Sequence, residues 1–243
     1  MSFVVIAFMP LTENIAGVRE RIAAAALRSG RKPEAITLMA VTKTFPPEQI
    51  REAYDAGIHV FGENRVQEFA GKFEAVRDLS AAEWHMIGHL QTNKAGKAAE
   101  LFGCVDSLDS VRLARNLNTT ASELGKKLRV LIEINVGGEA VKSGVPPDSK
   151  ELQNLLEAAP ELPFLEFRGL MTVPPYSANP EQSRPYFRKM WELFERIAGR
   201  QLPAMKMEVL SMGMSHDFEI AIQEGATCVR VGTAIFGERP RPR

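Results

Sequence analysis

The chain has 243 residues, of which 45% are apolar and 25% are charged, and its formal net charge is +0. This is the profile of a soluble globular protein, and the neutral balance offers no basic surface to nucleic acid or to an anionic membrane. The apolar start, residues 1–9, is too short to span a bilayer and lacks the basic region and cleavage site of a secretory signal. We therefore expect a cytoplasmic protein with no nucleic-acid or membrane partner, in which residues 1–11 form an N-terminal extension.

Hydrophobic periodicity divides the rest of the chain into alternating helices and strands. A helical repeat covers residues 12–29 and ends at Gly30. Eight apolar strands are predicted after it, at residues 37–43, 58–64, 84–88, 104–107, 128–136, 164–172, 208–211 and 227–231. Helices are predicted between them, at residues 47–56, 66–76, 93–101, 110–124, 149–159, 181–197 and 216–225. Asp109 and Ser215 are the expected N-caps of the fourth and the last of these helices.

This alternation predicts the fold. Eight strands, each followed by a helix or a helical piece, match a single (β/α)8 TIM barrel over residues 12–243, an α/β protein of one domain. An open doubly wound sheet would show the same alternation. The Gly-x-Gly-x-x-Gly signature of such sheets does not follow the first strand, which favours the barrel. In barrels of this type the functional site lies at the C-terminal ends of the strands.

The first predicted strand ends in a lysine, Lys43, and two prolines follow almost at once. Strand side chains alternate between two faces, so Met39, Val41 and Lys43 share one of them. If that face lines the barrel, desolvation favours the neutral amine, which is the form that makes a Schiff base with an aldehyde. The alternative is a lysine that ends a strand and extends to water.

Small and hydroxyl residues follow the last two strands. They are Ser211, Gly213 and Ser215 after the seventh strand, and Gly232 and Thr233 after the eighth. Barrels of this type commonly hold phosphate in these two loops. Glycine lets the backbone approach a ligand closely, and the free amides at a helix start favour an anion. These residues therefore predict a phosphate site beside Lys43.

A charged residue, Arg230, interrupts the eighth strand. It alternates in phase with Cys228 and Gly232, so we expect it to point into the barrel, where a buried charge needs a partner. A lysine Schiff base beside a phosphate site suits either a sugar-phosphate aldolase or a pyridoxal phosphate (PLP) protein. The inward arginine favours PLP, because the ring nitrogen of PLP can accept its hydrogen bond. The two cysteines and four histidines lack metal-ligand spacing, so we predict buried thiols and no metal.

Several segments together resemble the pyridoxal phosphate homeostasis protein family. They are residues 40–44, 61–64, 84–91, 169–171, 210–215 and 229–237. The resemblance implies a fold-type III PLP-binding barrel like the N-terminal domain of alanine racemase, with PLP held as a covalent aldimine at Lys43. It also implies that Arg230 faces the pyridine nitrogen and that Asn64 lies near the cofactor. The phosphate would be held by Ser211, Gly213, Ser215, Gly232 and Thr233.

The resemblance further implies a carrier and regulator of intracellular PLP that is not an enzyme. Its expected partners are PLP and apo forms of PLP-dependent enzymes, and we expect a monomer. An arginine does not keep the ring nitrogen protonated, so the cofactor would be a weaker electron sink. The alternative is a racemase-like enzyme or a Schiff-base aldolase, and a racemase needs a second base opposite the lysine. Tyr176, in the loop after the sixth strand, is the tyrosine expected near the barrel mouth, but no catalytic residue is assigned.

Overall fold

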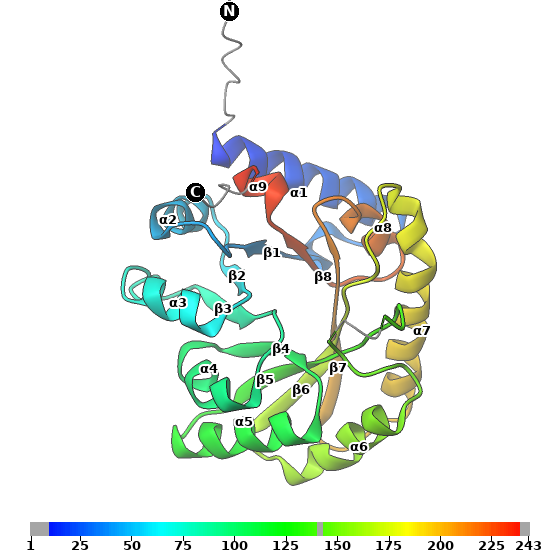
Figure 1. The fold of residues 1–243 in the computed structure, drawn as a ribbon. Coiled ribbons are helices and arrows are strands. Elements are labelled where there is room, and N and C mark those ends of the chain that lie inside the picture. The colour runs from blue at the N-terminus through cyan, green and yellow to red at the C-terminus, as the bar shows by residue number, and fades with distance from the viewer. Residues whose placement is uncertain (1–9, 140–142, 239–243) are drawn as a thin grey trace, which may run out of the picture.

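A computed structural model describes residues 10–139 and 143–238 of the chain. Eight parallel strands form a closed barrel in chain order, and the last strand pairs with the first. The strands are β1 (Thr37–Val41), β2 (Val60–Glu63), β3 (Glu83–Met86), β4 (Cys104–Leu108), β5 (Leu128–Glu133), β6 (Leu165–Met171), β7 (Met205–Met214) and β8 (Cys228–Val231). Figure 1 shows them inside a ring of helices, which confirms the (β/α)8 barrel predicted from the sequence.

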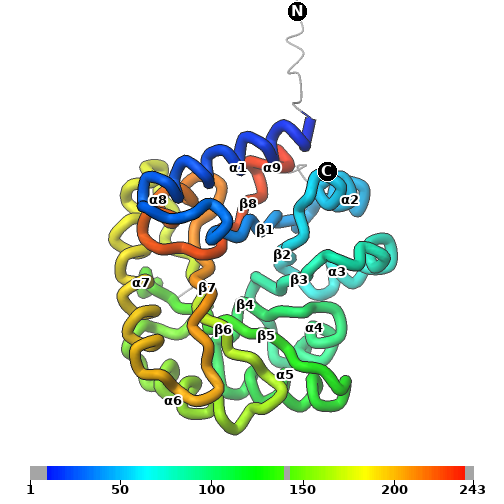
Figure 2. The backbone as a smooth tube through the Cα atoms, turned by 180° about the vertical axis from the view of Figure 1, so that it is seen from behind, coloured from blue at the N-terminus to red at the C-terminus, as the bar shows by residue number. Residues whose placement is uncertain are grey.

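The helices pack around the outside of the barrel. They are α1 (Leu11–Arg28), α2 (Pro47–Asp55), α3 (Val66–Phe73), α4 (Ala95–Leu101), α5 (Val111–Glu123), α6 (Lys150–Ala158), α7 (Arg184–Gly199), α8 (Phe218–Gln223) and α9 (Thr233–Phe236). Seen from behind in Figure 2, α1 lies beside α8 and α9, so the two ends of the described chain close the ring. The side-chain amide of Asn14 fixes this contact by donating to the carbonyl oxygen of Ile235 at 2.9 Å.

The strands are largely apolar, and most of their residues are buried. Every residue of β4 and β8 is buried, and the C-terminal residues of β1 and β2 are buried as well. Outside the barrel, the Trp84 ring stacks on Phe61 at 5.0 Å, and Phe69 of α3 lies 4.8 Å from Trp84 and 4.9 Å from Phe102. Such aromatic packing fixes helices to the sheet. The barrel is therefore a rigid support for the residues that follow each strand.

The C-terminal part of the barrel differs from the sequence prediction. β7 extends to Met214, beyond the predicted strand end at Ser211, so Gly213 lies inside a strand and not in a loop. The prediction of Ser215 as a helix N-cap is wrong, because α8 begins at Phe218 and its N-cap residue is Asp217. The Ser215 hydroxyl instead accepts hydrogen bonds from backbone N–H groups at the start of α9, so it binds the start of α9 and not that of α8.

Asp109 is also wrongly predicted as an N-cap. The cap of α5 is Ser110, whose hydroxyl accepts a hydrogen bond from the Leu113 N–H at 3.3 Å. The Asp109 carboxylate instead lies 3.1 Å from Nδ1 of His89, a residue that follows β3. Among the described residues, no helix has the length and hydropathy needed to cross a bilayer. Of the expected extension, residues 1–11, residues 1–9 lie outside the described ranges, and Leu11 is the first residue of α1.

Candidate functional site

A cavity of about 480 Å³ opens where the strands end. Its lining contains six of the eight site residues predicted from the sequence: Lys43, Asn64, Ser215, Arg230, Gly232 and Thr233. The remaining wall includes side chains that had no functional signal in the sequence: Val41, Phe45, Ile87, Val173, Met214 and His216. The structure thus brings an amine, a guanidinium group and a corner of small and hydroxyl residues into one site.

Lys43 reaches this cavity from a tight turn directly after β1. The turn is closed by a hydrogen bond from the Phe45 N–H to the Thr42 carbonyl oxygen at 3.1 Å, and Thr44 has a φ of +67°. The Phe45 ring stacks on Phe236 of α9 at 4.8 Å. Lys43 therefore extends from a turn whose two ends are held by these contacts. A lysine that simply ended a strand would not need such contacts.

Asn64 follows β2 and lies against the end of the next strand. The carbonyl oxygen of Asn64 would be 2.3 Å from a Cβ atom added at Gly88, so only glycine permits this approach. The Ile87 N–H donates to the carbonyl oxygen of Glu63 at 2.9 Å, which extends the pairing of β2 and β3 to this point. Asn64 is held at the cavity wall by backbone packing.

Arg230 points into the barrel, as predicted, and is 4% exposed. Its guanidinium group donates to the Ser211 hydroxyl at 2.8 Å and to the Thr172 carbonyl oxygen at 2.7 Å. Both partners are neutral, and among the described residues it makes no ion pair with a carboxylate. Burial lowers the pKa of Arg230, while nearby acidic groups such as Asp106 oppose this shift. An arginine nevertheless remains charged.

Ser211 and Gly213 lie behind the cavity wall. Ser211 is fully buried, and its hydroxyl holds the guanidinium group of Arg230. Gly213 has a φ of +92°, and a Cβ atom there would lie 2.5 Å from the Cβ of Ala221 on α8. Glycine is therefore required at residue 213 for α8 to pack against β7. These two predicted residues support the site from behind, and the other six line it.

The small-residue corner is held together by Ser215. Its hydroxyl accepts from the Gly232 N–H at 3.2 Å and from the Ala234 N–H at 3.3 Å, so it joins the end of β7 to the start of α9. Gly232 and Thr233 line the cavity at the same junction. The two loops predicted to act together are thus linked directly.

Tyr176 lies at the cavity mouth, as predicted. It lines the cavity with 78% of its surface exposed, and its ring is 5.2 Å from that of His216. The other two tyrosines are elsewhere: the Tyr54 hydroxyl accepts from the Ala81 N–H, and Tyr186 of α7 packs against the core. Tyr176 is therefore the tyrosine that can reach a ligand in this cavity.

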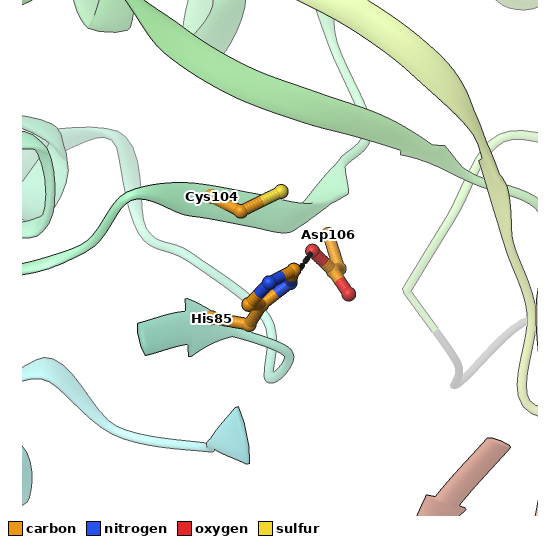
Figure 3. A group of neighbouring side chains, drawn as sticks. All are labelled: His85, Cys104 and Asp106. Carbon is orange, nitrogen blue, oxygen red and sulfur yellow. Dashed lines mark hydrogen bonds and ion pairs between the residues drawn. The ribbon is translucent and has the colours of Figure 1, made fainter. Parts of the chain in front are cut away.

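Three side chains with metal-ligating atoms gather inside the barrel, which the sequence analysis did not foresee. Figure 3 shows His85 of β3 beside Cys104 and Asp106 of β4. Nδ1 of His85 lies 2.9 Å from Oδ1 of Asp106. Burial alone would favour a neutral ring, but Asp106 raises the pKa of His85 well above its usual value. Burial raises the pKa of Cys104 to about 12, so its thiol is neutral. A buried ion pair accounts for this grouping without a metal.

Comparison with known families defines the class of the protein. Residues 14–240 match the family described as "Alanine racemase, N-terminal domain". An alanine racemase from Clostridium difficile, solved with cycloserine, shares the fold with a TM-score of 0.72 at 16% identity, over 95% of this chain and 60% of the racemase. The barrel is therefore of the alanine racemase N-terminal type.

More similar relatives identify the family within this class. Over 231 residues the chain is 49% identical to the pyridoxal phosphate homeostasis protein of Aquifex aeolicus, covering 95% of this chain and 99% of the relative. The structure of PipY from Synechococcus elongatus, solved with PLP bound, matches with a TM-score of 0.81 at 35% identity, over 93% of this chain and 100% of PipY. The chain belongs to the pyridoxal phosphate homeostasis protein family.

Proposed function

We propose that the chain carries PLP in the cavity at the barrel mouth and regulates its intracellular supply without robust turnover. The observation that carries this proposal is the convergence of Lys43, Arg230 and the Ser215–Gly232–Thr233 corner on one cavity. The names of the relatives and the PLP bound to PipY support the same function. PLP would be held as a Schiff base on Lys43.

The lining suits each chemical group of PLP. The Lys43 amine meets the aldehyde, the guanidinium N–H of Arg230 meets the ring nitrogen, and the corner around Thr233 meets the phosphate. The cavity of about 480 Å³ lies within the range of roughly 300–1,000 Å³ that is common for small-molecule sites. The bond forms when the neutral amine adds to the aldehyde carbon and the carbonyl oxygen leaves as water. Water, or an amine of a recipient protein, reverses the bond and releases the cofactor.

Two features of the site favour carrying PLP over using it. Arg230 is a hydrogen-bond donor held by Ser211 and Thr172, so it leaves the ring nitrogen unprotonated and weakens the cofactor as an electron sink. A racemase also needs a base that is positioned above the ring. Tyr176 is the candidate for that base, but it is 78% exposed at the cavity mouth.

The attachment is tested by trapping. Purified protein is mixed with PLP, reduced with borohydride and mapped by peptide analysis, and we expect the adduct on Lys43 alone. Lys43→Ala should abolish the visible Schiff-base absorbance while the protein stays folded. Lys97→Ala removes an exposed lysine that pairs with Glu100, and it serves as the matched control. An adduct located mainly on another lysine would contradict the assignment.

Two assays distinguish a carrier from an enzyme: one measures transfer of PLP to an apoenzyme, and the other measures turnover of amino acids. The loaded protein should restore the activity of a PLP-requiring apoenzyme, and racemisation of common L-amino acids should stay near the rate with PLP alone. Turnover of about 1 per second or faster, which is ordinary for enzymes, would favour the racemase-like alternative. Tyr176→Phe would then test whether the exposed tyrosine supplies the base.

A further inference from the structure

The turn that carries Lys43 has an unfavourable backbone. In residues 42–45, Lys43 takes the second position and Thr44 the third, where φ is +67°. That sign of φ is required at the third position of a type II turn, where glycine or asparagine is favoured. Threonine is β-branched, and a left-handed backbone costs such a residue conformational energy. The fold must therefore supply contacts that keep the turn in this form.

Those contacts come from α3. Nζ of Lys72 donates to the carbonyl oxygen of Thr42 at 3.1 Å and lies 3.4 Å from that of Phe45, the first and last residues of the turn. The carboxylate of Glu68 accepts the Thr44 N–H at 2.5 Å. The one left-handed residue and both ends of the turn are thus held by two side chains one helical turn apart.

Lys72 is itself fixed by two carboxylates. Its Nζ lies 2.9 Å from Oε1 of Glu63 and 3.0 Å from Oε1 of Glu68, and Lys72 is 9% exposed. Glu63 is completely buried and also accepts the Thr42 hydroxyl at 2.7 Å. Burial raises the pKa of Glu63, and Lys72 opposes this shift. Since Glu63 ends β2 and precedes Asn64, the same network joins both strand ends at this side of the cavity.

We propose that Glu63, Glu68 and Lys72 form a positioning clamp that holds turn 42–45 so that the Lys43 amine enters the cavity in the orientation needed for Schiff-base formation. This inference rests on the proposed function. It also explains why one of two neighbouring lysines reacts. The Lys72 amine is committed to four oxygen atoms, those of Thr42, Phe45, Glu63 and Glu68, and it cannot compete for the aldehyde.

The test begins with Glu68, because its side chain is 28% exposed and the protein can tolerate its replacement. Glu68→Ala should slow Schiff-base formation, followed by absorbance after mixing with PLP, by about tenfold to a hundredfold, since small displacements of a reacting group have effects of this size. Glu68→Gln keeps an oxygen that accepts the Thr44 N–H and should retain most of the rate. Glu74→Ala, at the exposed end of the same helix, is the matched control and should react at the wild-type rate.

Thr44→Gly separates positioning from general support of the fold. Glycine adopts a positive φ without steric cost, so the turn no longer needs the clamp to hold residue 44. Added to Glu68→Ala, it should return the rate to within about threefold of wild type. If Glu68→Ala slowed the reaction only by loosening α3, its thermal unfolding temperature would fall and the change at residue 44 would restore nothing. That outcome overturns the clamp.

The two proposals can fail separately. If the Lys43→Ala protein still captures PLP, the proposed attachment at Lys43 is wrong, whatever the clamp variants do. If the wild type is trapped at Lys43 and a folded Glu68→Ala protein reacts at the wild-type rate, the clamp inference is wrong and the proposed function stands. A borohydride-trapped adduct on Lys72 in the wild type would also overturn the clamp, because that amine would then be available.

Discussion

The two sides of the barrel mouth hold their buried cations in different ways. At the β1–β2 side, Lys72 is paired with the carboxylates of Glu63 and Glu68. At the β7–β8 side, Arg230 is held by the Ser211 hydroxyl and the Thr172 carbonyl oxygen. A cation paired with carboxylates has its charge balanced within the fold, and a cation held by neutral acceptors can still direct its charge at a ligand. On the proposed function, the first side would position the reactive Lys43, and the second would recognise the cofactor.

The largest effect expected from this difference is on stability. Lys72→Met leaves the Glu63 carboxylate buried without its cation, and breaking a buried pair in this way costs about 3–5 kcal/mol. Arg230→Met leaves only a hydroxyl and a carbonyl oxygen unsatisfied, which costs about 1–3 kcal/mol. Urea unfolding of the ligand-free variants at neutral pH measures both free energies. Equal losses would show that the two cations are held alike and would break the comparison.

The sequence indicated the buried Arg230 at one side of the barrel mouth but not the buried Lys72 at the other. Arg230 was recognisable because a charge interrupts an apolar strand, and the alternation of the strand predicted its inward direction. Lys72 lies in an amphipathic helix, where a lysine ordinarily faces water. It is buried because α3 packs over turn 42–45, a contact between residues 30 positions apart that no local pattern encodes. The barrel was predictable from periodicity, whereas this network depends on tertiary packing.

The differences in the C-terminal strands have the same origin. Gly213 has the character of a loop residue, and the sequence analysis placed it in the loop after the seventh strand. Gly213 instead lies within β7, where its positive φ favours glycine. Glycine is also needed there because α8 packs too closely for a side chain at that residue. Likewise, the pairing of His85 with Cys104 across β3 and β4 brings Asp106 to His85. Because His85 and Asp106 are 21 residues apart in the sequence, no local pattern indicated this contact.

His85, paired with Asp106, is a third buried cation. Its raised pKa predicts that the free energy of unfolding depends on pH. The folded pKa of His85 is raised by Asp106, although burial opposes the shift. The contribution of His85 to stability is therefore complete below its unfolded pKa of about 6.5 and is lost as the pH rises through the folded pKa. The free energy of unfolding should fall over this range by less than the effect of Lys72→Met, because only a proton is removed.

Urea unfolding at a series of pH values from 6 upward measures this loss. The double variant His85→Asn, Asp106→Asn replaces both charges with amides of similar shape, and it should show no such fall. In the wild type, Asp106 has a lowered pKa despite its burial, because His85 stabilises its charged form. Its contribution is therefore kept at neutral pH and lost only in acid, as the pH falls through its folded pKa. A wild-type curve parallel to that of the double variant would mean that the pair is not ionised.

The smallest effect concerns two hydroxyl residues that the sequence analysis treated alike, Ser211 and Thr233. Thr233 lines the cavity, so on the proposed function Thr233→Ala would remove a hydrogen bond to the phosphate, roughly 1.5–3 kcal/mol or about tenfold or more in affinity for PLP. Ser211 contacts Arg230 and does not line the cavity, so Ser211→Ala acts on the ligand only through Arg230 and should weaken binding by about threefold.

Pyridoxal, which lacks the phosphate, tells these two roles apart. Titration with PLP and with pyridoxal should show that Thr233→Ala weakens only the binding of PLP, because its hydroxyl acts on the phosphate. Ser211→Ala should weaken both ligands by the same factor, because it acts through Arg230 on the ring that they share. If Ser211→Ala weakened PLP alone, the hydroxyl would act on the phosphate after all. The β7–β8 side would then be organised as the sequence suggested, with both strands supplying hydroxyls to a single anion.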